Sequence, residues 1–160
     1  MALVNRRETL QRLGQALGLV ALVETAGAVG MYLWPRKPKP REGAYGGVVT
    51  AGPVDTFAPE SVTAFAKGQF YLVRLRDGSF LALSRRCTHL GCTVPWSETE
   101  KRFTCPCHAS SFDETGEVLS APAPRPLDLY RVAIEDGVVK VDTSVAVSRS
   151  RFEPSQAVRA

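Results

Sequence analysis

The sequence of 160 residues is poor in the residue types that usually bind transition metals, with only two histidines and four cysteines. All six lie between positions 87 and 108, which random scatter along the chain would rarely produce. Such clustering favours metal ligation, with a leftover cysteine pair for a disulfide.

The larger part of the chain also lacks an excess of charge of either sign. The formal net charge is +4, but residues 1–43 hold seven Lys and Arg against three acids, whereas residues 44–160 hold thirteen of each. A nucleic-acid-binding domain needs a basic face to neutralise phosphates. The neutral part therefore argues against nucleic-acid binding, and the basic N-terminal part beside an apolar run indicates membrane attachment.

A single long apolar run, ALGLVALVETAGAVGMYLW, occupies residues 16–34. At about 1.5 Å per residue it covers roughly 28 Å, close to the ~30 Å hydrocarbon core of a bilayer. Tyr32 and Trp34 stand at its end, where aromatic residues prefer the headgroup level. We predict a cytoplasmic N-terminus at 1–15 and a transmembrane anchor at 16–34.

A cleaved signal peptide or a buried core helix is the alternative for this run. The apolar region of a signal peptide is about 7–15 residues long and ends at small residues. Here the run is longer and ends in bulky aromatics. Glu24 in mid-span is costly, so it either faces another helix, is protonated, or reaches an interface as the helix slides or tilts.

Residues 35–47, PRKPKPREGAYGG, form the predicted linker. Its Pro and Lys part is stiff and solvated, and its Gly part is flexible. Such a segment can act as a hinge between an anchor and a head, or as a tether without a mechanical role.

From residue 48 onward the predicted elements are short strands. Residues 70–75 and 80–83 flank the turn RDGS, and residues 129–135 and 138–141 flank Asp-Gly, which are hairpin signals. Thr-Gly at 115–116 marks another turn. Only Pro59–Ala66 is expected to form a short helical turn.

The sequence thus predicts a mainly β, antiparallel domain at 48–143. The tail at 144–160 lacks periodicity and is expected to be disordered or to lie on a partner.

Two short boxes carry the candidate metal ligands, CTHLGC at 87–92 and CPCHAS at 105–110. Each offers one Cys and one His at close spacing. A [2Fe–2S] cluster needs four terminal ligands, and both thiolate and imidazole bind iron. A structural zinc site is the alternative because Cys₂His₂ also suits zinc. Zinc fingers pair Cys with Cys and His with His, however, and zinc leaves the other two cysteines unexplained.

The two boxes resemble those of the Rieske iron–sulfur proteins of cytochrome bc and bf complexes. The similarity extends through VPW at 94–96 and APAP at 121–124, and covers most of residues 46–142. It implies a Rieske-type antiparallel β domain with a small cluster-binding subdomain. It also implies one [2Fe–2S] cluster per subunit, with a potential of about −150 to +300 mV.

The resemblance implies a role for each residue of the boxes. Cys87 and Cys105 would hold one iron, and His89 and His108 the other, at an exposed tip. Cys92 and Cys107 would form a disulfide between the loops, and residues 121–124 would cover the cluster. The residues expected around the cluster are Leu90, Ser110, Phe112 and Pro122.

Three positions, Ala109, Phe112 and Ala121, depart from the residues usual in this family or in its high-potential members. Ser110 matches a serine that donates a hydrogen bond to sulfur, but Phe112 stands where a tyrosine does the same. Hydrogen bonds to sulfur stabilise the reduced cluster. We therefore expect a lowered potential, which suits menaquinol better than ubiquinol. Ala109 and Ala121 replace glycines usual in the family.

The function that the resemblance implies is electron transfer within a membrane quinol:cytochrome c oxidoreductase, or one with a plastocyanin-type acceptor. His108 would accept a hydrogen bond from quinol, and His89 could titrate too, because positive charge on iron makes its imidazole ligands more acidic. The expected partners are a cytochrome b-type subunit, a c-type cytochrome and quinol, in a dimeric complex. The head would swing on the linker to reach the c-type haem.

Other functions share parts of this pattern. The small Rieske subunit of an arsenite-oxidase-like molybdoenzyme is also exported and can have the disulfide, but the VPW and APAP stretches favour the bc type. Soluble Rieske ferredoxins and oxygenase domains lack the extra Cys pair and the anchor. Nothing in the sequence suggests the regulatory domain of a cluster-bearing sensor.

Counting basic residues does not settle the orientation of the anchor, because three lie before it and four after it. Two other features indicate the compartment of the head. A persistent disulfide implies an oxidising compartment. NRRETL at 5–10 looks like a twin-arginine export signal, although Thr9 stands where a bulky apolar residue is common; a cytoplasmic charge clamp is the alternative. We predict a single-pass protein of a bacterial inner membrane, with its head on the extracytoplasmic side.

Overall fold

One long helix, α1 (Arg6–Leu33), makes up the N-terminal unit of the computed structural model, which describes residues 5–34 and 45–160. The Asn5 side chain caps the helix by accepting a hydrogen bond from the Arg7 N–H, and Glu8 adds negative charge to the first turn. The helix thus begins at Arg6 rather than at residue 16, because residues 6–15 are good helix formers behind a cap. It is long and apolar enough to cross a membrane.

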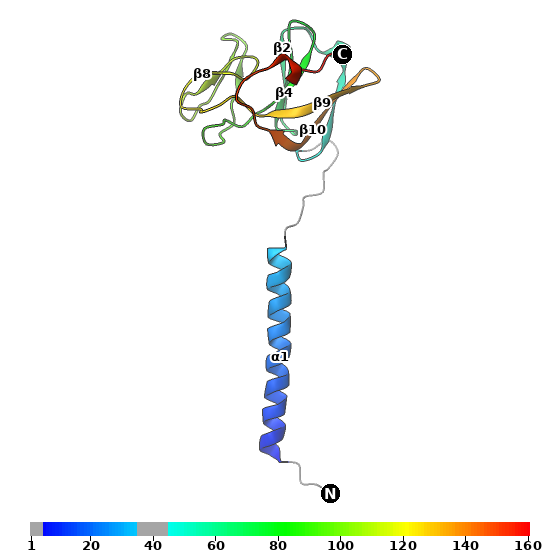
Figure 1. Cartoon of the computed structure of the whole chain (residues 1–160), viewed down its shortest axis with the longest axis vertical. Coiled ribbons are helices and arrows are strands. Elements are labelled where there is room, and N and C mark those ends of the chain that lie inside the picture. The colour runs from blue at the N-terminus through cyan, green and yellow to red at the C-terminus, as the bar shows by residue number, and fades with distance from the viewer. Residues whose placement is uncertain (1–4, 35–44) are drawn as a thin grey trace. The chain divides into compact units, whose positions relative to one another are not determined.

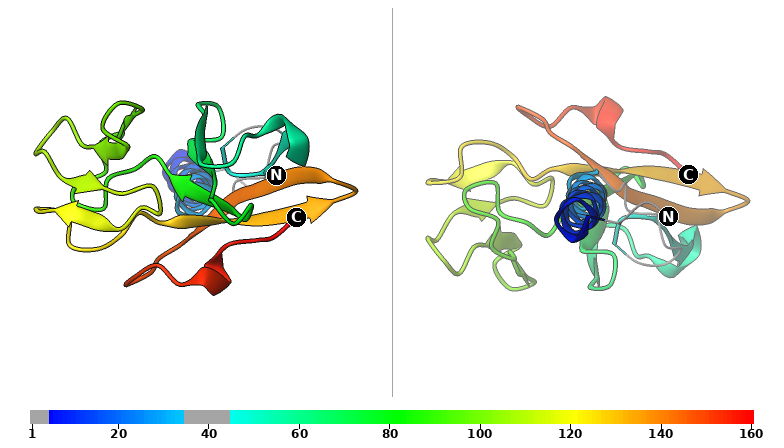
Figure 2. Two further views of the ribbon diagram at one scale, coloured as in Figure 1. Left: turned by 90° about the horizontal axis from the view of Figure 1, so that it is seen from above. Right: turned by 90° about the horizontal axis from the view of Figure 1, so that it is seen from below.

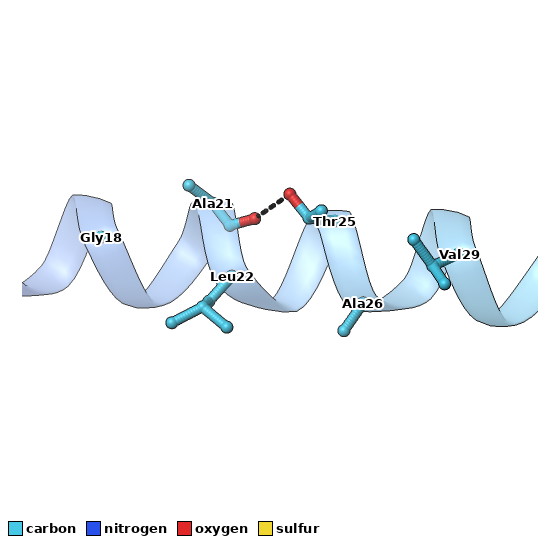
Figure 3. Close-up of a pocket in the computed structure, with 6 residues that line it drawn as sticks. All are labelled: Gly18, Ala21, Leu22, Thr25, Ala26 and Val29. Atoms are coloured by element: carbon cyan, nitrogen blue, oxygen red, sulfur yellow. Dashed lines mark hydrogen bonds between the residues drawn. The ribbon is translucent and has the colours of Figure 1, made fainter.

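Small side chains follow one face of α1 (Figure 3). The Thr25 hydroxyl donates a 2.7 Å hydrogen bond to the Ala21 carbonyl one turn earlier. This bond gives the hydroxyl a partner within the helix, which hydrocarbon chains of lipid could not provide. This face is slightly hollowed, and a second helix could approach it closely. The hollow is lined by Gly18, Ala21, Leu22, Thr25, Ala26 and Val29.

The second unit is a head built on an antiparallel sheet of six strands, in the order β1-β10-β9-β4-β3-β2 (Figure 1). The two predicted hairpins are confirmed as β3–β4 and β9–β10. The strands are β1 (Val48–Pro53), β2 (Ser61–Phe65), β3 (Phe70–Arg74), β4 (Phe80–Ser84), β9 (Leu129–Glu135) and β10 (Val138–Val147).

A smaller antiparallel sheet is inserted in the chain between β4 and β9. In Figure 2 it lies at the opposite end of the head from the β9–β10 turn. Its strands are β5 (Trp96–Ser97), β6 (Arg102–Thr104), β7 (Ser111–Phe112) and β8 (Val118–Ser120), and two short 3-10 helices, η1 (Val54–Thr56) and η2 (Pro154–Gln156), complete the head. This mainly β architecture confirms the predicted fold class.

The central strands β3 and β4 are buried on both faces, because alternate side chains point to opposite sides of a sheet. Tyr71 and Leu83 belong to one hydrophobic core, and Phe70 and Phe80 to the other. The first core continues under the small sheet and includes two of the candidate ligands, Cys87 and Cys105. The site is therefore anchored in the hydrophobic core of the head.

Two expectations about local structure are wrong. Pro59–Ala66 contains the strand β2 instead of a helical turn, since residues 61–65 pair with the whole of β3 and Val62 packs on the first core. The tail is also ordered. β10 continues to Val147, and Val158 exchanges backbone hydrogen bonds of 2.8 and 2.9 Å with Phe80 of β4. Single contacts of this kind leave no periodic pattern in a sequence.

The end of the predicted linker belongs to the head. The Thr143 hydroxyl accepts hydrogen bonds from the Gly46 and Gly47 N–H groups at 3.0 and 3.3 Å, and lies 2.8 Å from the Gly47 carbonyl, to which it can donate. Gly47 is buried. Any hinge must therefore lie before Tyr45, and residues 35–44 of the predicted linker fall outside the described residues.

Thr143→Val should release residues 46 and 47 from the head, because valine keeps the shape of threonine but leaves the buried glycine groups without the hydroxyl. We expect the segment to open more easily by about 1–3 kcal/mol. Hydrogen exchange of the full chain in detergent would measure this at Gly47. Thr50→Val, at an exposed position on the neighbouring β1, is the matched control. Equal protection in both variants would contradict the assignment.

Candidate metal centre

The two Cys/His boxes form loops with the same hydrogen-bond pattern. In the first loop, after β4, the Cys87 N–H donates to the Cys92 carbonyl and the Gly91 N–H to the Cys87 carbonyl, both at 2.8 Å. In the second loop, between β6 and β7, the Cys105 N–H donates to the Ser110 carbonyl at 2.8 Å and the Ala109 N–H donates to the Cys105 carbonyl at 2.9 Å. The two boxes therefore form loops of the same backbone conformation, each closed by two equivalent hydrogen bonds.

The equivalence of the loops explains why glycine suits position 109, where this chain has alanine. Ala109 occupies the position of Gly91, and both have positive φ, at +58° and +80°. A left-handed conformation costs a residue with a Cβ about 1–2 kcal/mol relative to the right-handed one. The loop around Ala109 nevertheless closes, so the substitution leaves its geometry intact.

The two loops are joined by a disulfide between Cys92 and Cys107, which confirms the predicted pair. The imidazole rings of His89 and His108 lie edge to face, with ring centroids 4.8 Å apart. The loops thus bring together two histidines that are 19 positions apart in the sequence. His108 is exposed and His89 is half-buried, as expected for a tip.

The other two cysteines are reduced and buried beneath the loops. Burial raises the pKa of the Cys87 thiol, and the neighbouring Cys105 thiol raises it further, while hydrogen bonds from the His89 N–H and the Ser110 hydroxyl act in the opposite direction. The Ser110 side chain thus acts on the Cys87 thiol, and its role as a donor to cluster sulfur stays a prediction. Two adjacent buried thiols meet the need of a metal centre for thiolate ligands shielded from water.

A second grouping of sulfur atoms needs to be distinguished from the predicted ligand set. The sulfurs of Cys92, Cys105 and Cys107 lie within 4.8 Å of one another. The disulfide consumes two of these three, so that only Cys105 offers a thiolate. The predicted set of two thiols and two imidazoles fits an iron–sulfur cluster better than this trio does.

A third segment, residues 121–126, crosses both loops. The Ala123 N–H donates to the Ser110 hydroxyl at 3.0 Å, and the Thr88 hydroxyl donates to the Arg125 carbonyl at 2.6 Å. The predicted covering stretch 121–124 is thus bonded to the second loop through Ala123, and the residue that follows it, Arg125, is bonded to the first loop. Thr88 and Arg125 were not among the predicted site residues, since their pairing across 37 positions leaves no local signal.

The remaining predicted residues divide between core and surface. Ser110 and Phe112 are fully buried, and Phe112 shares a hydrophobic core with Cys87 and Cys105. Leu90 is 70 % exposed beside His89, and Pro122 is also exposed. A cavity of about 300 Å³ opens next to His89 and is lined partly by Tyr45, Arg86 and Tyr130.

Comparison with known proteins agrees with this site. The family described as "Rieske [2Fe-2S] domain" matches residues 48–131. The cytochrome b6-f complex iron-sulfur subunit 1 of Synechocystis sp. is 34% identical over 146 residues, which are 82% of this chain and 81% of that protein. The corresponding subunit of Chlorobaculum tepidum is 34% identical over 144 residues, which are 86% and 75% of the two chains.

A solved structure of similar sequence is the cyanobacterial plasma membrane Rieske protein of Synechocystis PCC 6803. It is 32% identical, with a TM-score of 0.47 over 59% of this chain and 98% of that one. The family match and the two cytochrome b6-f relatives, together with the paired loops, their disulfide and the buried thiols, lead to one conclusion. The chain belongs to the Rieske [2Fe–2S] family, as an iron–sulfur protein of the cytochrome bc/bf type.

Proposed function

We propose that the chain takes electrons from a membrane quinol and delivers them to a c-type haem, with Cys87, His89, Cys105 and His108 holding its cluster. The observation that carries this proposal is the pair of adjacent imidazoles, His89 and His108, on the same two loops that contain the buried, reduced thiols of Cys87 and Cys105. When bound, the cluster accepts and releases one electron. Relatives that are cytochrome b6-f subunits support the same role in a membrane oxidoreductase complex.

The protein side chains would supply the binding and proton chemistry. The exposed His108 ring can accept a hydrogen bond from a quinol hydroxyl at the nitrogen that does not bind iron. Leu90, exposed beside His89, offers an apolar contact to the ring of the quinol. The burial of Cys87 and Cys105 keeps water from the sulfur atoms.

The proposed partners are a cytochrome b-type subunit and a c-type cytochrome in a dimeric complex. A quinol dissolved in the bilayer requires a membrane-anchored acceptor, and α1 is suited to be the anchor. The head would move on the predicted linker 35–47, whose Gly46 and Gly47 would move with the head because both are hydrogen-bonded to Thr143. We place the head on the extracytoplasmic side, where the disulfide would persist.

The ligand set is tested by single substitutions in the membrane complex. Cys87→Ser, His89→Ala, Cys105→Ser and His108→Ala should each abolish the EPR signal of the reduced cluster and the quinol-dependent reduction of the c-type haem. Cys92→Ser with Cys107→Ser should still give the signal after assembly but lose it faster, because the cross-link across 15 positions is gone. A full signal in the absence of Cys87 would refute the assignment.

The quinone preference is tested at Phe112. Phe112→Tyr should raise the midpoint potential in a voltammetric titration, because a hydroxyl donated to sulfur stabilises the reduced, more negative cluster. Phe103→Tyr is the matched control, as Phe103 is equally buried, faces Phe112 across β6 and β7, and packs on Tyr71 and Trp96. An unchanged potential in Phe112→Tyr, or an equal rise in both, would count against a missing sulfur donor.

The orientation is tested at the arginine pair. Arg6→Lys with Arg7→Lys should block export, leaving the head in the cytoplasm, where Cys92 and Cys107 stay reduced. Thiol labelling of intact cells and of lysates would measure the location of the head and the redox state of Cys92 and Cys107. Arg12→Lys, on the same helix, should export normally. Normal labelling of the exported head in the double variant would argue against this route.

A further inference from the structure

The C-terminal tail contains a buried arginine that the proposed function does not use. Arg149 is only 8% exposed. Its Nε donates to the Leu127 carbonyl at 2.9 Å, one Nη donates to the Gln156 side-chain oxygen at 3.0 Å, and the other Nη donates to the Thr115 carbonyl. By contrast, the side chain of Arg151, two residues later, is 76% exposed and pairs with Glu153.

The partners of Arg149 belong to two segments near the metal centre. Leu127 directly follows the covering segment 121–126, and Thr115 lies in the turn between β7 and β8. The same two segments meet through a 2.9 Å hydrogen bond from the Leu127 N–H to the Gly116 carbonyl. Arg149 therefore joins the tail, the turn and the base of the covering segment at one point.

The packing at this junction requires a glycine. Gly116 has φ of +81°, and a Cβ added to it would lie 2.7 Å from an Arg149 Nη and 3.2 Å from the Leu127 Cβ. The guanidinium thus fills the space that any other side chain at position 116 would need. Such a fit holds Arg149 in a single arrangement.

The charge of Arg149 is balanced at longer range. Burial lowers the pKa of the guanidinium, while the carboxylates of Glu117, Asp113 and Asp128 act to raise it. Its hydrogen bonds go to uncharged oxygens, namely the carbonyls of Leu127 and Thr115 and the side-chain oxygen of Gln156. A planar fork with five N–H donors can reach three such acceptors at once, whereas a lysine presents a compact point charge on a flexible stem.

A short series of hydrogen bonds leads from the covering segment to the cluster ligands. The Ala123 N–H donates to the Ser110 hydroxyl at 3.0 Å, and the Ser110 carbonyl accepts a 2.8 Å hydrogen bond from the N–H of the predicted ligand Cys105. On the other loop, Thr88 bonds the Arg125 carbonyl. The orientation of the sulfur donor Ser110 thus depends on a segment whose base is held by Arg149.

We propose that Arg149 is a positioning residue that sets the reduction potential of the cluster, by holding segment 121–127 and, through the Ala123 N–H, the hydroxyl of the predicted sulfur donor Ser110. This inference rests on the proposed ligand set. The proposal gives the tail, residues 144–160, a role in the redox chemistry, although none of its residues is among the predicted ligands. The effect is exerted through hydrogen bonds of the protein, without contact between Arg149 and the cluster.

The test compares Arg149→Met and Arg149→Lys with Arg151→Met in the full chain purified in detergent. Hydrogen exchange of residues 121–127 should become about tenfold faster or more in both Arg149 variants, because hydrogen bonds from a charged donor are lost. Their midpoint potential should fall, because Ser110 donates less well to sulfur. Both quantities should be unchanged in Arg151→Met.

A double-mutant cycle with Ser110→Ala separates positioning from general loosening. If Arg149 acts through Ser110, Arg149→Met should lower the potential much less in the Ser110→Ala background than in the natural one. Gln156→Leu removes one hydrogen-bond acceptor of Arg149 and should lower the midpoint potential by a smaller amount. This variant keeps the proposal testable if the Arg149→Met protein fails to fold.

Faster exchange with an unchanged potential would show that Arg149 has only a structural role, and would overturn the proposal. An equal fall in both Ser110 backgrounds would overturn it too. Neither measurement involves quinol or haem. A failure here therefore leaves the proposed function intact, whereas a cluster that persists without Cys87 would refute the ligand set itself.

Discussion

The disulfide between Cys92 and Cys107 is the constraint on which the metal centre depends. It links two loops that come from different places in the chain, one after β4 and one between β6 and β7. Each loop alone closes through its own backbone hydrogen bonds and offers one cysteine and one histidine. The four proposed ligands come from both loops, and a cross-link outside this set holds the loops together without using either of the two free thiols.

The six-stranded sheet supplies the platform beneath this arrangement. β3 and β4 are buried on both faces, and the first loop continues directly from β4, so Cys87 starts from a rigid position. The second loop is held by the small sheet, whose Phe103 and Phe112 share the core that contains Cys87 and Cys105. The sulfur side of the site is thus part of the hydrophobic core, while His89 and His108 extend toward solvent. This division suits a centre that must shield its sulfurs and yet contact a substrate.

The sequence predicted those features that depend on local pattern or on short motifs. The hairpins β3–β4 and β9–β10 follow from alternation and turn residues, and the resemblance carried by the two boxes implied the disulfide that the structure contains. The tail and the hydrogen bond between Thr88 and Arg125 could not be predicted in this way. Each depends on individual contacts between distant positions, such as Val158 with Phe80, which produce no periodicity. β2 was mistaken for a helical turn because pairing with β3 outweighs local preference.

Ser110 shows how these long-range contacts bear on the chemistry. Its hydroxyl accepts a hydrogen bond from the Ala123 N–H and its carbonyl accepts one from the Cys105 N–H, so that one residue connects the covering segment to a candidate ligand. The side chain is fully buried, and a buried hydroxyl held by a backbone donor has a restricted orientation. The boxes identify Ser110 as a sulfur donor, but the strength of that donation depends on residue 123 and on the contacts that hold its segment. The redox properties of such a centre are therefore determined by the packing of the whole head as well as by the residues of the two boxes.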